Sequence, residues 1–286
     1  MSAPPPDGQR TATLKRHVAE LFDRAAPTYD RVGVEFFSPH GTRLVELAEI
    51  KPGQRVLDLG FGRGACLFPA ADAVGPTGRV VGIDISPTML DRTSAEVAER
   101  GLSQVRLGLG DAERPDFPEG SFDTVTCGHV MSFLPSPAAA VAGAHRMLRP
   151  GGSFALSTLG RADADARWQP VFGAVVAYLP PDAFLPQAIN QDAPIRGVPA
   201  WEAALRDAGF GSVRTVTERH RTRFASAEDW WAFGWSHGQR LVWEQIPEES
   251  LEPARHATFT ALAEISGPNG CLTWDTDVHY TIGERT

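Results

Sequence analysis

The 286-residue sequence is poor in lysine and has no apolar run long enough to cross a membrane. Only two of its 27 Lys and Arg residues are lysines, Lys15 and Lys51. The formal net charge is -8, and a nucleic-acid-binding protein needs a clustered basic surface instead. The N-terminal segment lacks the charged and apolar regions of a signal peptide. We therefore expect a cytoplasmic protein with a flexible start over residues 1–12, no nucleic-acid partner and no membrane span.

Cysteine is also scarce, with only Cys66, Cys127 and Cys271. An odd number of widely spaced cysteines fits neither a disulfide framework nor a zinc site. Small buried hydrophobic residues are the favoured interpretation. No pair of histidines has the spacing of metal ligands, so no metal is expected.

Tryptophan is absent from the first half of the chain, because all seven lie at or after Trp168. This imbalance indicates either two cores of different character or a second half that lines an apolar, aromatic cavity. The second interpretation would suit a largely apolar ligand.

What is present is a regular alternation of strands and helices up to about residue 160. Helical spacing covers 13–26 and 42–50, and later helices are predicted over 64–74, 86–100 and 137–148. Ser86-Pro87 has the residues of a helix start. Apolar strands are predicted over 56–59, 79–85, 105–109, 121–127 and 152–158. Five such strands joined by helices predict an α/β fold with a parallel sheet covered on both faces.

This rhythm breaks after Gly160. Residues 161–197 show no clear strand, a helix is predicted over 198–208, and strands over 211–218 and 278–283 flank a helical segment at 225–266. The predicted organisation is a core at 13–160 with N-terminal lid helices, a substrate cap at 161–210 and 225–275, and final core strands at 211–218 and 276–286.

A glycine-rich loop follows the first strand, in Val56-Leu-Asp-Leu-Gly-Phe-Gly-Arg-Gly64. Gly60, Gly62 and Gly64 permit a tight turn and let a ligand approach the backbone. The same loop fits a dinucleotide fingerprint, which keeps a nicotinamide-dependent dehydrogenase open. Asp58 argues against it, because an acid ahead of the loop suits an ammonium group and would repel a pyrophosphate.

Further polar groups end the next strands. Asp84 closes the second strand 20 residues after Gly64, where a carboxylate can accept both ribose hydroxyls of a nucleoside. Gly110-Asp111-Ala112 follows the third strand, Cys127-Gly-His129 ends the fourth, and Arg149-Pro-Gly-Gly152 precedes the fifth. In this order the motifs predict one nucleoside-binding site along the sheet edge.

With these motifs the chain resembles class I S-adenosylmethionine (SAM)-dependent methyltransferases, and among them the small-molecule group around the ubiquinone/menaquinone biosynthesis enzymes. Residues 22–30, Phe-Asp-Arg-Ala-Ala-Pro-Thr-Tyr-Asp, resemble that group's N-terminal signature. The resemblance implies a Rossmann-like seven-stranded sheet of order 3-2-1-4-5-7-6, with strand 7 antiparallel and a helical cap inserted.

The resemblance also implies the roles of individual residues. The methionine part of SAM would lie against Asp58, Gly60 and Gly62. The ribose would be held by Asp84, and the adenine by the side chains of Ile85, Met89, Asp111 and Ala112. Cys127 and His129 would lie near the methyl end, and Tyr29 and Phe37 would close over the cofactor, which leaves as S-adenosylhomocysteine (SAH).

Two positions depart from the family's usual loop, which has Cys and Thr where this chain has Phe61 and Arg63. The threonine hydroxyl is therefore missing. Arg63 is open to two interpretations: a partner of the cofactor carboxylate or an exposed helix residue.

His129 is the candidate general base, because it ends a strand at the edge where open α/β sheets bind their ligands. A pocket-wall residue without a proton-transfer role is the alternative. His220 and His237 are weaker candidates and more typical of surface or packing histidines.

The predicted function is methyl transfer to oxygen, carbon or nitrogen of a small, largely apolar or aromatic secondary metabolite. A SAM-binding cyclase that transfers no methyl, an NAD(P)-dependent dehydrogenase and a non-catalytic binding module are the alternatives. The sequence leaves the oligomeric state open, with a homodimer as one option.

Overall fold

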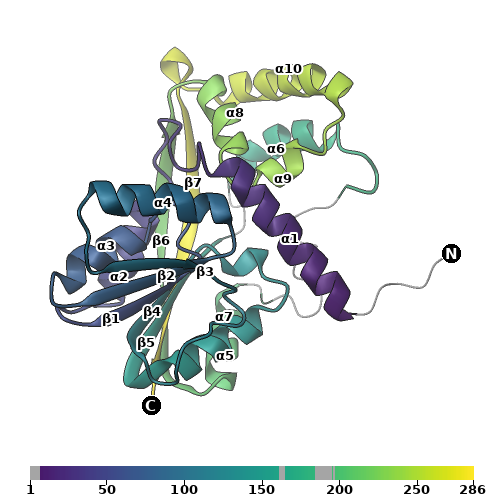
Figure 1. The fold of residues 1–286 in the computed structure, drawn as a ribbon. Helices are drawn as coiled ribbons and strands as arrows, with labels where there is room; N and C mark the ends of the chain where they lie inside the picture. Colours follow the sequence, from purple (N-terminus) through teal and green to yellow (C-terminus); the bar gives the residue numbers. More distant parts are fainter. Residues whose placement is uncertain (1–6, 161–164, 184–194, 196) are drawn as a thin grey trace.

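A computed structural model describes residues 7–160, 165–183, 195 and 197–286. Its centre is a seven-stranded sheet of order β3-β2-β1-β4-β5-β7-β6 (Figure 1). Strands β1 to β5 are mutually parallel where they pair, and β7 runs antiparallel to both β5 and β6. The predicted fold class is thereby confirmed. The strand bounds are β1 Arg55–Leu59, β2 Arg79–Asp84, β3 Val105–Leu109, β4 Phe122–Gly128, β5 Leu148–Leu159, β6 Phe210–Phe224 and β7 Leu272–Arg285.

Helices cover both faces of the sheet, as the buried, almost continuously apolar strands require. Helices α2 (Phe37–Leu47), α3 (Leu67–Val74) and α4 (Pro87–Glu99) pack on one face. Helices α5 (Pro137–Met147) and α7 (Val198–Asp207) pack on the other. Ser86 starts α4 as predicted, since its hydroxyl accepts a hydrogen bond from the Met89 amide at 3.0 Å.

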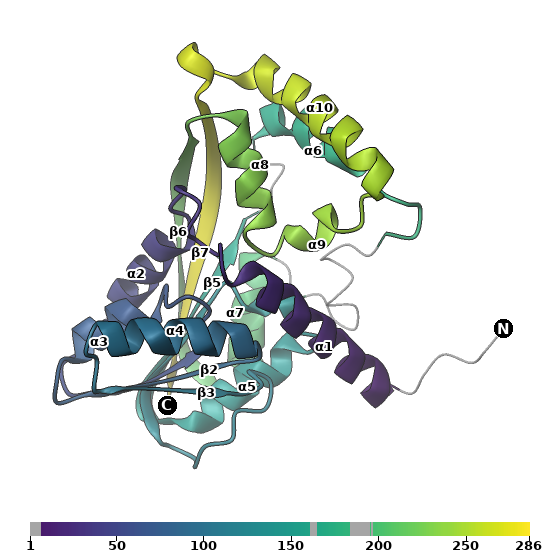
Figure 2. The same ribbon diagram turned by 45° about the horizontal axis from the view of Figure 1, so that its top comes forward.

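The first helix, α1 (Asp7–Ala25), begins six residues earlier than the predicted start at Thr13. It contacts α4 beside the sheet and α9 (Arg240–Trp243) of the cap. Figure 2 shows α1 between α4 and the cap.

Strands β6 and β7 are much longer than the predicted 211–218 and 278–283, and they pair from Phe210↔Arg285 to Phe224↔Leu272. Their far ends rise toward the cap (Figure 2), where Phe224 and Leu272 are buried. The predicted limits were wrong because charged residues lie just outside them, after position 218 in β6 and before position 278 in β7.

Those charged residues lie on the exposed face of the ribbon and pair across it. Arg219 contacts Asp277 at 2.9 Å, and Arg221 contacts Asp275 at 2.7 Å. Opposite charges in neighbouring strand positions are compatible with a two-stranded ladder, so charge did not end the strands.

The cap consists of α6 (Gln169–Val176), α8 (Ala227–Trp235), α9 and α10 (Glu248–Ile265). A cluster of aromatic side chains forms its interior, with Trp168, Trp230, Trp243 and Trp274 buried. Trp168 stacks on Trp230 with ring centroids 5.9 Å apart. The tryptophan-rich half thus contains a core separate from that of the sheet.

Trp201 is the exception among the tryptophans. It lies on α7, which the sequence analysis placed in the cap segment, but it packs with Leu205 in the sheet core. Cys66 and Cys127 are buried as expected, whereas the expectation is wrong for Cys271, which is exposed beside the tight turn that precedes β7. None of the helices in the described part of the chain is long and apolar enough to span a membrane.

Candidate active site

Two adjoining cavities open where the carboxyl ends of β1, β2 and β4 meet. The first has a volume of about 710 Å³ and the second about 360 Å³, open mouths included. Both are lined by Tyr29, Gly60, Gly62, Gly128 and His129, so these residues mark the junction. This is the sheet edge at which open α/β folds place ligands.

The glycine loop forms the floor of the junction. Gly60 and Gly62 have φ values of +71° and +51°, which side-chain-bearing residues rarely adopt. A Cβ atom on Gly60 would lie 2.4 Å from a methyl carbon of Val130. The loop can therefore pass this close to the segment that follows β4 only with glycine at position 60.

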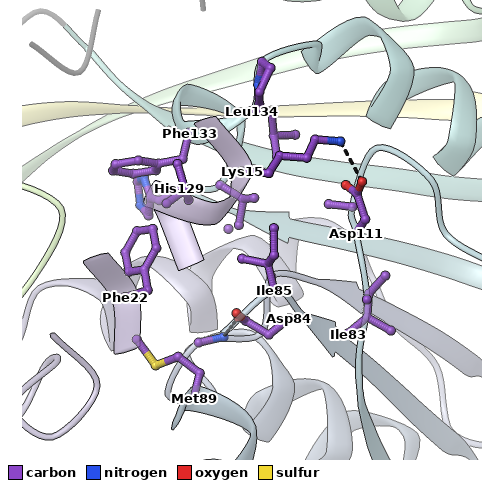
Figure 3. A pocket seen from close by; sticks show the side chains of 18 of the residues that line it. Lys15, Phe22, Ile83, Asp84, Ile85, Met89, Asp111, His129, Phe133 and Leu134 are labelled. Atoms are coloured by element: carbon purple, nitrogen blue, oxygen red, sulfur yellow. Dashed lines mark hydrogen bonds and ion pairs between the residues drawn. The ribbon is translucent and has the colours of Figure 1, made fainter. Parts of the chain in front are cut away.

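Asp84 lines the first cavity at the end of β2 and is tied to the loop. Its Oδ2 accepts a hydrogen bond from the Gly62 amide at 2.8 Å, and its Oδ1 accepts one from the Ser86 amide at 2.9 Å. Burial raises the pKa of this carboxyl to about 6. Ile85 and Met89 line the same cavity, and Figure 3 shows them beside Asp84.

Asp58 lines the second cavity, and only one of its two carboxylate oxygens has a hydrogen-bond partner among the described residues. Its Oδ1 accepts a hydrogen bond from Thr126 Oγ1 at 2.7 Å, while Oδ2 is buried and has no partner among the described residues. Burial raises the pKa of Asp58 to about 7. A buried carboxylate oxygen without a partner is costly, and a bound cationic group would satisfy it.

Arg63 also lines the second cavity, and its side chain is only 12% exposed. One terminal nitrogen donates to the Ala26 carbonyl at 3.0 Å, and the other contacts Glu96 at 3.3 Å. Its Nε is buried without a partner in the described part of the chain. The exposed-helix interpretation of Arg63 is therefore wrong, and burial lowers the pKa of its guanidinium.

Asp111 and Ala112 line the first cavity, but Asp111 is already paired. Lys15 Nζ lies 2.6 Å from Asp111 Oδ2 (Figure 3) and also contacts Glu113. Sequence reasoning missed Lys15, although it is one of only two lysines. At the other end, Tyr29 stacks on Phe37 with centroids 4.8 Å apart, and both line the second cavity.

His129 lies at the junction in a sparsely populated backbone conformation, with φ of +57°. Its amide donates to the carbonyl and hydroxyl oxygens of Ser157 at 3.1 and 3.2 Å. Burial, together with nearby His220, lowers the pKa of His129 to about 4, so the imidazole is neutral at pH 7.

His40, on α2, was missed by sequence reasoning. Its Nδ1 lies 3.1 Å from His129 Nε2, and its ring is 4.4 Å from that of His220, measured between centroids. Burial, with His129 and His220 nearby, lowers the pKa of His40 to about 2. Since 89 residues separate His40 from His129, no local pattern links the two. The one available signal was that His40 lies just before a predicted helix.

Three further expectations are resolved by position. Cys127 lines neither cavity and packs in the sheet core, because side chains alternate along β4 and position 127 faces away from the junction. His220 bonds to the Tyr280 hydroxyl at 3.0 Å, outside the cavities. His237 packs inside the cap against Phe233. None of the seven tryptophans lines either cavity.

The sheet order, the glycine loop and the acids at the ends of β1 to β3 define the class I methyltransferase fold. Residues 56–152 match the methyltransferase domain family. The chain is 42% identical over 254 residues to nocamycin O-methyltransferase of Saccharothrix syringae, with 84% of this chain and 87% of the relative covered. The chain therefore belongs to the class I SAM-dependent methyltransferases that act on small molecules.

Other relatives agree with this assignment. Aklanonic acid methyltransferase of Streptomyces sp. (strain C5) is 43% identical over 198 residues, covering 68% of this chain and 84% of that one. Demethylmenaquinone methyltransferase of Listeria welshimeri is 29% identical over 220 residues, covering 72% and 93%. Among solved structures, YcgJ of Bacillus subtilis shares the fold, with a TM-score of 0.59, 20% identity and coverage of 86% and 98%.

Proposed function

We propose that this methyltransferase moves the methyl group of SAM to an oxygen atom of a small, largely apolar metabolite. The observation that carries the proposal is the meeting of two cavities at His129, with an unsatisfied carboxylate oxygen of Asp58 in one and Asp84 in the other. The O-methyltransferase name of the 42% identical relative supports oxygen as the accepting atom.

The residues of the two cavities fit SAM. In the second cavity, Asp58 Oδ2 would accept from the ammonium group and Arg63 Nε would donate to the carboxylate of the methionine part. In the first, Asp84 would hold the ribose, with Ile85 and Met89 beside the adenine and Asp111 and Ala112 at its edge. Gly60 and Gly62 would let the cofactor pass between the cavities along the backbone.

Bound SAM supplies an electrophilic methyl group on a sulfonium, and the protein must align an acceptor oxygen with it and exclude water. His129 is at the junction of the cavities, where that alignment is needed. Its neutral imidazole can accept the proton of an acceptor hydroxyl, a contribution of about 10²–10⁴ to the rate in other enzymes.

The acceptor would lie against apolar walls of the first cavity. Phe22 and Phe133 meet edge to face there, with centroids 5.0 Å apart, and Figure 3 shows both next to His129. Within the described part of the chain, the residues that line the two cavities all lie between Lys15 and Pro135. We therefore propose that α1 and the segment after β4 select the acceptor, and that the cap tryptophans act through packing alone.

Binding and product analysis test this function. Calorimetry with SAM, SAH and NAD should show binding of the first two only. The protein should then be incubated with methyl-labelled SAM and small aromatic metabolites that carry phenol or carboxylic acid groups, aklanonic acid among them. Mass spectrometry then measures the masses of the products. A labelled O-methyl product supports the proposal. An unlabelled, rearranged product would indicate a cyclase, and NAD binding without SAM binding would indicate a dehydrogenase.

A further inference from the structure

The contact between His40 and His129 has a chemical consequence for the reacting end of the site. His40 is buried, with 2% of its surface exposed, whereas His129 is partly buried, and their facing nitrogens are 3.1 Å apart. One of the two rings must donate and the other accept, because both imidazoles are neutral in this environment. The other nitrogen of His129, Nδ1, is buried without a partner in the described residues.

The backbone of His129 is held independently of this contact. Two bonds from its amide to Ser157 and the left-handed φ of +57° place the Cα atom at the junction. They do not determine the rotation of the ring or the nitrogen that carries the proton. Among the described residues, the hydrogen bond to His40 is the polar contact of the His129 ring.

The pair allows two arrangements. If His40 donates, His129 Nδ1 carries a hydrogen and can only donate to a ligand. If His129 Nε2 donates, Nδ1 keeps its lone pair and can accept a proton. His129 can take the proton of an acceptor hydroxyl on Nδ1 only in the second arrangement.

We propose that His40 is a positioning residue that accepts the Nε2 hydrogen of His129 and so presents the Nδ1 lone pair of His129 to the acceptor. The inference rests on the proposed function. As the oxygen–methyl bond forms and the carbon–sulfur bond breaks, the hydroxyl proton goes to His129 Nδ1. The imidazolium that results keeps its Nε2 hydrogen bond to His40 Nδ1.

The surroundings of His40 explain why another imidazole fills this place. The groups facing it are the rings of His129, His220 and Phe36, the last with its centroid 4.7 Å away. The nearby carboxylate, Glu218, is held by Arg43 at 2.7 Å and reaches His220 at 3.8 Å. His40 is neutral, so it can orient His129 without bringing a negative charge next to the methyl acceptor.

The test reads the tautomer of His129 directly and needs no acceptor. The full chain is labelled with ¹⁵N in its histidine rings, saturated with SAH, and measured by long-range ¹H–¹⁵N correlation NMR at pH 7. The His129→Asn variant assigns the signals. His40→Asn keeps an amide near the Nδ1 position, His40→Phe removes it, and His256→Asn on the exposed face of α10 is the matched control.

We expect a single His129 tautomer with its hydrogen on Nε2 in the wild type, in His40→Asn and in His256→Asn. In His40→Phe, a mixture of tautomers should appear. A hydrogen on Nδ1 in the wild type, or an unchanged tautomer in His40→Phe, would overturn the proposal, and the first result does not depend on either His40 variant. Calorimetry with SAH on the same samples distinguishes the failure of this proposal from the failure of the proposed function. Absence of SAH binding would refute the function, whereas the tautomer measurement alone decides the role of His40.

Discussion

Lys15 Nζ lies 2.6 Å from Asp111 Oδ2, so one of the two lysines of the chain joins α1 to the segment that follows β3. The Lys15 side chain is 17% exposed and that of Asp111 31% exposed. This half-buried ion pair closes the first cavity on the side of α1, and the mobility of α1 should depend on it.

Replacing this lysine tests the closure. Lys15→Met removes the contacts with both Asp111 and Glu113, and it should speed amide hydrogen exchange along α1 by about fivefold or more, since even a solvent-exposed ion pair contributes up to about 1 kcal/mol. Arg16→Met is the matched control, because Arg16 pairs with Glu20 on the exposed surface of the same helix. Equal effects of both variants would show that the contacts of Lys15 with Asp111 and Glu113 do not hold α1.

Asp84→Ala should weaken SAM binding by about 1–3 kcal/mol, through the loss of ribose hydrogen bonds to a charged acceptor. Asp84→Asn should keep the fold better, because an amide oxygen can still accept from one of the two backbone amides. Calorimetry of both variants is compared with Asp91→Ala on the exposed face of α4. Unchanged affinity in Asp84→Ala would remove this residue from the cofactor site.

Cofactor affinity should rise with pH and level off above about pH 7.5. The pKa of Asp58 is raised to about 7 and that of Asp84 to about 6, so both are partly protonated at pH 6 in the free protein. A bound ammonium and ribose hydroxyls favour the ionised carboxylates, so binding at pH 6 must release protons.

Calorimetry of SAH binding in two buffers of different ionisation enthalpy counts those protons. Asp58→Asn should lower the number released, leaving the part that belongs to Asp84. If the number stays the same in Asp58→Asn, Asp58 is not the group that meets the ammonium.

His129→Ala should lower turnover of a confirmed acceptor by about 10²-fold or more while SAM affinity changes little. The reason is that the proposed base acts on the acceptor proton and makes no charged contact with the cofactor. Steady-state kinetics and calorimetry give the two values. Equal losses in both would assign His129 to the cavity wall instead.

Trp230→Phe should destabilise the protein by about 1–3 kcal/mol without changing SAH affinity, because Trp230 is fully buried in the cap and lines neither cavity. Trp235→Phe is the milder control, since Trp235 is half-buried beneath Arg240. Thermal unfolding and calorimetry report the two properties. A large loss of SAH affinity in Trp230→Phe would show that the cap core shapes the cofactor site.

Local patterns predicted much of the core. The apolar strands, the three glycines after β1 and the Ser86 cap are short-range features, and the structure has them where they were expected. The ends of β6 and β7 could not be predicted in this way. Their exposed Arg and Asp residues are typical of loops until the partner strand supplies the opposite charge.

The sequence by itself determined the sheet, the glycine loop and the acids at its strand ends, because the carboxyl ends of parallel strands necessarily meet at one edge. Only the tertiary structure decided which side chains meet across that edge from distant segments. His40 reaches His129, Lys15 reaches Asp111, and Cys127 faces away from the site. These contacts depend on how α1 and α2 pack on the sheet. Such packing results from the burial of many side chains from distant segments, and no short-range sequence pattern indicates it.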